Sequence, residues 1–311
     1  MNILKDFSSK TIRLEPDYEG EVTATLVSSN FNQGDRKSVL YLHGYVDYFF
    51  QAHLGEKFNA NSFDFYALDL RKYGRSLLPH QHPNYCRDLA EYHEEISLAI
   101  RHINDASNGE IILMGHSTGG LIASNYMNES ADRHLIKGLI LNSPFLDFNQ
   151  SGFKKYMVYL AALIMTRFSE FSKVDGALSP AYVKSIHKDY YGEWDFNHKW
   201  KPLEGFPTYF RWLLAIRSAH KKLAASNIQV PVLVMHSSSS AKISKYSEEA
   251  KYNDIVLDVS DIKKIGAKLG DKVSLLEVEN AMHDIFLSPK AIREKAFEGM
   301  FSWLNTLKSN S

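Results

Sequence analysis

The feature that most constrains the fold of this chain is a glycine-flanked turn between an apolar run and a helix-like segment. The run Ile111–Met114 is followed by Gly115-His116-Ser117-Thr118-Gly119 and then by the helix-like stretch 120–126. A serine on so sharp a turn takes a strained backbone conformation, and glycines two positions to either side remove side chains that would collide. The helix behind it presents backbone N–H groups where negative charge develops. The pattern predicts that Ser117 projects above a buried sheet as a nucleophile.

Short apolar runs that predict strands alternate with amphipathic segments along most of the chain. The predicted strands are Glu21–Val27, Ser38–Leu42, Phe63–Leu68, Glu110–Met114, Gly138–Leu141, Val230–His236 and Val273–Glu279. The predicted helices are Arg87–Ile103, Leu121–Glu129 and Pro289–Leu307. The middle strands are apolar on both faces, as buried parallel strands are. This alternation predicts an α/β fold with a mostly parallel, doubly wound sheet.

The alternation stops between Pro144 and about residue 227, where the chain is rich in aromatic residues and contains no clear strand. A stretch of that length is too long for a connecting loop. We therefore predict a core formed by residues 1–146 and 228–311, with residues 147–227 inserted as a helical cap. Apolar residues are so dense from Phe153 to Phe171 that one surplus face is expected to line an acyl pocket or to touch a membrane surface transiently.

Composition excludes several other classes of protein. Lys+Arg and Asp+Glu are both 36, so the chain has no basic surplus for nucleic acid. Cys86 is the only cysteine, which excludes an intrachain disulfide and a multi-cysteine metal site. The longest apolar run, Met157–Met165, is far shorter than the roughly 20 residues that cross a bilayer. The N-terminus has no basic segment followed by an apolar run, so we expect a cytoplasmic protein without a signal peptide.

A nucleophilic serine needs a base, and His283 has the position for one. It follows the last predicted strand, in Asn280-Ala-Met-His-Asp-Ile-Phe, and it follows Ser117 in the chain. Reacting groups of open parallel sheets gather beyond the carboxyl ends of the strands. We expect His116 to point into the protein interior instead.

A second glycine turn, His43-Gly44-Tyr45, follows the strand predicted at Ser38–Leu42. It predicts an oxyanion hole made by the backbone N–H groups of Tyr45 and Thr118, each contributing about 3–4 kcal/mol of barrier lowering. An ordinary β-turn is the alternative interpretation.

With these residues the chain resembles the α/β-hydrolase superfamily, in its branch of serine aminopeptidases, monoacylglycerol lipases and lysophospholipase-like enzymes. The matching motifs are Leu40–Tyr45, Ala67–Ser76, Gly115–Gly120, Pro231–Met235 and His283-Asp284. The resemblance implies a serine hydrolase with a helical cap and without a metal or organic cofactor. It also implies that Asp69 and Gly74 shape a turn and take no part in catalysis.

The acid of the expected triad is the least determined member. The family places it shortly after the strand that here ends at His236, but this chain has Ser237–Ser240 there, with no carboxylate. Asp254, which precedes Ile-Val-Leu, resembles the family's acid segment, so we predict Asp254 with an insertion ahead of it. Asp258 and Asp147 are the alternatives.

The predicted activity is hydrolysis of carboxylic esters through an acyl-enzyme. The expected substrates are lipid-like esters (a lysophospholipid or a monoacylglycerol) or aryl esters. An aminopeptidase is the second hypothesis, and it needs cap carboxylates to hold a free amine. The candidates for that role are Glu170, Asp175, Asp189, Glu193 and Asp195. A non-catalytic binding protein that keeps the fold is the third hypothesis. The sequence does not predict an oligomeric state.

Overall fold

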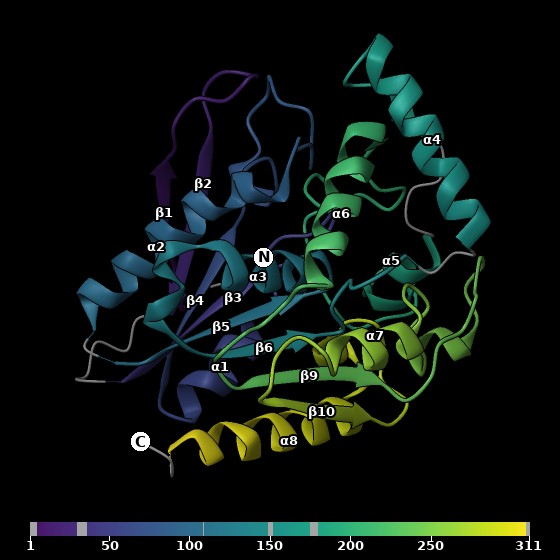
Figure 1. The fold of residues 1–311 in the computed structure, drawn as a ribbon. Coiled ribbons are helices and arrows are strands. Elements are labelled where there is room, and N and C mark those ends of the chain that lie inside the picture. Colours follow the sequence, from purple (N-terminus) through teal and green to yellow (C-terminus); the bar gives the residue numbers. More distant parts are fainter. Residues whose placement is uncertain (1–4, 30–35, 108, 149–151, 175–179, 309–311) are drawn as a thin grey trace.

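A mostly parallel sheet of eight strands runs through the protein (Figure 1). The computed structural model describes residues 5–29, 36–107, 109–148, 152–174 and 180–308. The strand order is β1-β2-β4-β3-β5-β6-β9-β10, in which β1 pairs with β2 and β2 with β4 antiparallel, and the other neighbours are parallel. The strands are β1 Ser8–Arg13, β2 Thr23–Ser29, β3 Lys37–Leu42, β4 Phe63–Asp69, β5 Ile111–His116, β6 Ile136–Asn142, β9 Val232–Ser237 and β10 Val273–Val278.

Helices cover both faces of the sheet. The helices α1 (Ala52–Ala60) and α8 (Lys290–Lys308) lie on one face, and α2 (His93–Ala106), α3 (Thr118–Glu129) and α7 (Val259–Gly266) lie on the other. Successive residues of β3 pack on opposite faces of the sheet. Tyr41 lies in one apolar cluster with Phe58 and Phe297, and Leu40 lies in the other cluster with Ile96. Side chains of a strand alternate between faces, so a strand buried on both is apolar throughout. The predicted doubly wound α/β sheet is confirmed.

The segment between β6 and β9 stays outside the main sheet. It holds α4 (Gly152–Phe168), α5 (Pro180–Ile186) and α6 (Phe210–Leu223), with a short antiparallel pair formed by β7 (Lys173–Val174) and β8 (Thr208–Tyr209). We predicted no strand here, and this ladder is a correction; two-residue strands are too short to leave a periodic pattern. We call residues 147–227 the inserted segment, and their role as a cap stays a proposal.

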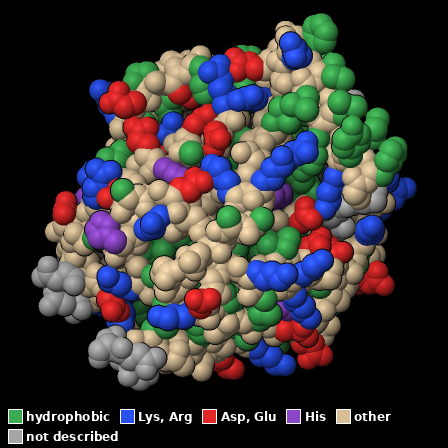
Figure 2. Space-filling model, in the orientation of Figure 1, with side chains coloured by type: hydrophobic (Ala, Val, Ile, Leu, Met, Phe, Trp, Pro, Cys, Tyr) green, Lys and Arg blue, Asp and Glu red, His purple; other side chains and the backbone are tan. Residues whose placement is uncertain are grey.

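The helix α4 stands out at the surface (Figure 2). It packs against α6 through Tyr159 and Ala162, which are buried, while Phe153 and Phe168 near its two ends are 75% and 83% exposed. Among the described residues, no helix combines the length and the apolar composition that crossing a bilayer requires.

Candidate active site

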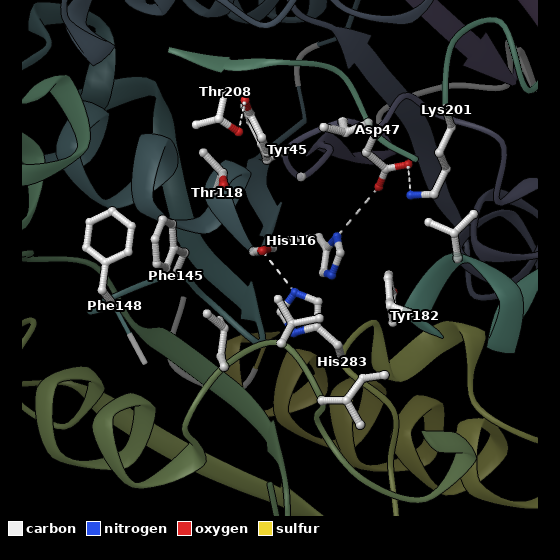
Figure 3. Close-up of a pocket in the computed structure, with 18 of the residues that line it drawn as sticks. Tyr45, Asp47, His116, Thr118, Phe145, Phe148, Tyr182, Lys201, Thr208 and His283 are labelled. Atoms are coloured by element: carbon white, nitrogen blue, oxygen red, sulfur yellow. Dashed lines mark hydrogen bonds and ion pairs between the residues drawn. The ribbon is translucent and has the colours of Figure 1, made fainter. Parts of the chain in front are cut away.

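A cavity of about 660 Å³ opens at the carboxyl edge of the sheet. The chain passes from β3 to β4 on one side and then returns to β5 on the other, so β3 and β5 are neighbours where the strand order reverses. Ligands of open α/β sheets bind outside the strand ends at such a reversal. The cavity is bordered by the loop after β3, by the turn after β5 and by the inserted segment (Figure 3).

The turn after β5 holds Ser117 in a strained conformation. Its φ is +52°, in a region that residues other than glycine rarely adopt. The backbone strain of such a conformation is about 1–3 kcal/mol. Four backbone hydrogen bonds keep it there: Ser117 N–H donates to the carbonyl of Asn142 (3.0 Å), and its own carbonyl accepts from Gly120 (2.9 Å), Leu121 (3.2 Å) and Phe145 (3.0 Å). The helix α3 begins at the next residue.

The flanking glycines of the motif are needed for close backbone approach. A Cβ on Gly115 would lie 2.5 Å from the carbonyl oxygen of Gly119. A Cβ on Gly119 would lie 2.5 Å from the carbonyl oxygen of Leu42, at the end of β3. Real Cβ atoms essentially never come this close to another atom. A side chain at either position would therefore collide with the backbone, as inferred from the sequence.

Ser117, His283 and Asp254 form a hydrogen-bonded chain. Nε2 of His283 lies 2.9 Å from Oγ of Ser117, and its Nδ1 lies 2.9 Å from Oδ2 of Asp254. All three side chains are buried, and His283 comes from the loop that follows β10. The second oxygen of Asp254 accepts the backbone N–H groups of Val256 (2.9 Å) and Leu257 (2.8 Å). The carboxylate is thereby fixed, and it fixes the orientation of the imidazole.

An excursion of the chain ahead of Asp254 explains the missing carboxylate after β9. Residues 241–253 leave the strand end and return to it: Asp254 N–H donates to the carbonyl of Ser239, and Ala241 N–H donates to the carbonyl of Asp254, both at 3.0 Å. Asp254 therefore lies beside the continuation of β9. Of the two alternatives, Asp258 caps the N-terminus of α7 and Asp147 binds Nζ of Lys155 at 2.5 Å.

The two residues predicted to stabilise an oxyanion both border the cavity next to Ser117. A Cβ on Gly44 would lie 3.3 Å from Cβ of Ser117, so the loop carrying Tyr45 passes directly beside the serine. The Tyr45 hydroxyl donates to Oγ1 of Thr208 (3.2 Å), which turns the side chain toward the inserted segment. Thr118 is the first residue of α3, where N–H groups have no partner within the helix. The oxyanion role of both backbone groups stays a prediction.

Beyond His283 the cavity has a polar end that sequence reasoning missed (Figure 3). Nζ of Lys201 lies 2.7 Å from Oδ1 of Asp47, and both side chains are buried. Nδ1 of His116 lies 3.8 Å from the other oxygen of Asp47. Both ring nitrogens of His116 and the hydroxyl of Tyr182 have no hydrogen-bond partner among the described residues. His116 is buried as expected, but it borders the cavity. Lys201 is 154 residues from Asp47, and no spacing in the sequence indicates such a pair.

The polar end is electrically balanced. Burial alone raises the pKa of Asp47, but Lys201 and then His116 outweigh burial and hold that pKa well below its usual range. Asp47 is therefore ionised at neutral pH and neutralises Lys201. At the opposite end of the cavity lie the rings of Phe145 and Phe148, and Trp212, Leu213 and Ile243 add further apolar surface to the lining.

Asp69 and Gly74 shape a turn, as the resemblance implies. The carboxylate of Asp69 accepts the backbone N–H groups of Phe49 (2.9 Å) and Arg75 (3.1 Å). Gly74 has a φ of +49°, and a Cβ there would meet Tyr48 and Asp69. The turn positions the loop that carries Asp47.

Comparisons with known proteins agree with this architecture. A family profile described as serine aminopeptidase, S33, matches residues 33–290. A search of curated protein sequences gives no match. Among solved structures, a soluble variant of monoglyceride lipase from Saccharomyces cerevisiae, in complex with a substrate analog, is 18% identical with a TM-score of 0.71, covering 99% of both chains.

A thermostable carboxyl esterase from Bacillus coagulans, in complex with glycerol, is 14% identical with a TM-score of 0.69, covering 96% of this chain and 99% of its own. Monoacylglycerol lipase from Paleococcus ferrophilus is 18% identical with a TM-score of 0.64, covering 96% and 99%. These likenesses establish the fold. With the profile match over most of its length, the chain belongs to the serine aminopeptidase S33 family and has the α/β-hydrolase fold.

Proposed function

We propose that the protein is a serine hydrolase that cleaves carboxylic esters with an apolar acyl chain and a small polar leaving group. The observation that carries the proposal is the chain Asp254–His283–Ser117, which opens into a cavity that is apolar at one end and polar at the other. The names of the similar structures, two monoacylglycerol lipases and a carboxyl esterase, support the same substrate class.

In the proposed reaction Oγ of Ser117 attacks the ester carbonyl carbon while Nε2 of His283 takes its proton. Asp254 accepts the Nδ1–H bond, which keeps the correct tautomer and stabilises the imidazolium. The backbone N–H groups of Tyr45 and Thr118 bind the oxyanion. The C–O bond then breaks, and Nε2–H gives its proton to the departing alcohol. Water, activated by the same imidazole, releases the carboxylic acid and restores the serine.

The two ends of the cavity favour one orientation of the ester. The acyl chain lies along the apolar wall that includes Phe145 and Phe148, because each buried methylene contributes about 0.8 kcal/mol. The leaving alcohol lies at the polar end, which is lined by Asp47, Lys201 and Tyr182. A monoacylglycerol or a lysophospholipid combines these two properties, and aryl esters fit the same wall.

The aminopeptidase hypothesis has less support, because none of the described acidic residues proposed for it lines the cavity. Glu170 binds Arg87, Glu193 binds Arg293, Asp195 binds Lys188, and Asp189 lies beside His187. Asp175 lies outside the described residues. Among the described residues that line the cavity, Asp47 alone is acidic, and Lys201 neutralises it. A free ammonium group would find no unpaired carboxylate there.

We also propose that α4 rests on a lipid surface while the substrate enters. Its exposed side chains are almost all apolar, and they form one continuous face from Phe153 to Phe168. Lys154, on the first turn of the same helix, lines the cavity, so the apolar face borders the cavity mouth. A substrate with a long acyl chain can then pass from lipid to cavity with little exposure to water.

The test is the variant Ser117→Ala assayed on p-nitrophenyl esters. Hydrolysis is expected to fall at least about 10³-fold, because the nucleophile is removed and only binding and oxyanion stabilisation remain. An unchanged melting temperature checks that the fold is intact. A fluorophosphonate probe should label the wild type and leave the variant unlabelled. Full activity in the variant would contradict the proposal, and an unlabelled, inactive wild type would favour the non-catalytic binding protein.

A further inference from the structure

A second group of metal-ligating side chains lies outside the cavity, in the inserted segment. His187 directly follows α5, Asp189 lies in the next turn, and His198 lies on the loop that leads to Lys201. One nitrogen of each histidine and one carboxylate oxygen of Asp189 lie within 4.8 Å of one another. The rings of His187 and His198 are 4.3 Å apart between centroids, so two imidazoles and a carboxylate lie close together.

His187 is the buried member of the group. Its Nδ1 accepts the backbone N–H of Asp189 (3.1 Å) and lies 3.7 Å from Oδ2 of that residue. An ion bound at Nδ1 would take the place of this hydrogen bond. Nε2 has no hydrogen-bond partner among the described residues.

The backbone around the group is fixed, while two of its side chains can still turn. Trp194 N–H donates to the carbonyl of Ile186 (2.9 Å), and Lys188 N–H donates to the carbonyl of Trp194 (2.8 Å), on either side of His187. Asp189 and His198 are exposed. Ligands bound to one Zn²⁺ ion at 2.0–2.2 Å lie about 3–3.5 Å apart. The ligand atoms here lie within 4.8 Å of one another, and rotation of the exposed side chains of Asp189 and His198 would bring them to the shorter spacing.

We propose that His187, Asp189 and His198 form a Zn²⁺ site, with water completing the coordination. Two imidazoles and one carboxylate suit zinc, whereas Mg²⁺ and Ca²⁺ prefer an all-oxygen set. The nearest cation in sequence, Lys188, is bound to Asp195 and leaves the group accessible. The ion would join the end of α5, which carries the cavity residues Tyr182 and Val183, to the loop that carries Lys201. It would therefore brace two walls of the cavity without touching the ester.

The experiment measures zinc retained by the full chain after equilibrium dialysis against micromolar Zn²⁺, together with the melting temperature with and without the ion. The variants are His198→Ala and Asp189→Asn, both at exposed positions, and the matched control is His102→Ala, an exposed histidine on α2. Metal analysis of the dialysed protein gives the stoichiometry directly and does not depend on any esterase assay.

The expected result is one zinc per wild-type chain and a melting temperature raised by several degrees. His198→Ala should lose at least tenfold in zinc affinity and lose the thermal shift, and His102→Ala should behave as the wild type. Wild-type protein that retains no zinc, or equal retention by His198→Ala and wild type, would overturn the proposal. An inactive but zinc-binding protein would refute the proposed ester hydrolysis alone.

Discussion

At the scale of single residues, the side chain of Asp254 determines how the imidazole of His283 is oriented. One of its oxygens accepts two backbone N–H groups and the other accepts from His283, so the carboxylate has no rotational freedom left. An imidazole that donates Nδ1–H to this carboxylate would present the lone pair of Nε2 to Ser117, as the proposed reaction requires. The orientation of the His283 imidazole is therefore set by the loop after β9, which carries Asp254.

The pair of Asp47 and Lys201 leads to a prediction about stability. Lys201→Met leaves the Asp47 charge buried without its partner, so we expect a loss of about 3–5 kcal/mol in the free energy of unfolding at pH 7. In the wild type the pKa of Asp47 is depressed, so its stabilising effect is present above its unfolded pKa of about 3.9 and disappears as the pH falls through the folded value. In the variant burial dominates and raises this pKa, so the folded protein gains a proton in mild acid.

The deficit of the variant is therefore expected to be larger at pH 7 than at about pH 4.5, measured by urea denaturation at both values. Lys188→Met is the matched control, because its pair with Asp195 is exposed and should leave the free energy of unfolding unchanged. Equal deficits at the two pH values would show that Lys201 contributes packing and no charge compensation.

At the scale of secondary-structure elements, α4 gives a prediction about membranes. Phe153→Ser combined with Phe168→Ser should weaken binding to vesicles of phosphatidylcholine and phosphatidylglycerol at least tenfold, because each phenyl ring contributes about 1.5–3 kcal/mol on burial. Cosedimentation measures the binding. Neither residue lines the cavity, so hydrolysis of a water-soluble short-chain ester should not change.

The matched control for this surface is Leu275→Ser, an exposed apolar residue on β10, which should bind vesicles as the wild type does. A double variant with unchanged vesicle affinity would leave the apolar face of α4 without a lipid role.

The elements also show what the sequence could and could not predict. All seven predicted strands are present, and the central parallel strands β3, β5, β6 and β9 could be predicted because they are largely buried apolar runs. The edge strand β1, Ser8–Arg13, was missed because it is mostly polar and exposed, and pairs with β2 alone. The helix α1 was missed because it has no side-chain N-cap and contains a glycine; a Cβ on Gly55 would lie 2.7 Å from the ring of Phe7.

The candidate site divides in the same way. Ser117 and His283 could be chosen from local context, since each follows a strand at the carboxyl edge of the sheet. The polar end could not be predicted, because Asp47 and Lys201 meet only when the inserted segment folds over the sheet. The same is true of His187 and His198, whose proximity depends on the path of one loop.

At the scale of the whole molecule, the cavity predicts a dependence on acyl length. Along a series of p-nitrophenyl esters from acetyl upward, kcat/KM should rise about fourfold per methylene until the apolar wall is covered, because each CH₂ contributes about 0.8 kcal/mol. Steady-state kinetics measure the slope. Phe148→Ala should flatten the slope for long chains and leave the acetyl ester unchanged. A decline in kcat/KM from acetyl onward would instead indicate a pocket for small esters.

The closure of residues 241–253 at Ser239 and Asp254 has a consequence for how such a protein can change. The excursion contributes Lys242, Ile243 and Ser244 to the cavity, yet its two ends are fastened at the strand. Its interior can therefore be lengthened, shortened or exchanged while the carboxylate keeps its place. Substitutions within residues 241–253 can therefore change which substrates the cavity accepts without moving Asp254. This stretch is the first place to alter when substrate selectivity is redesigned.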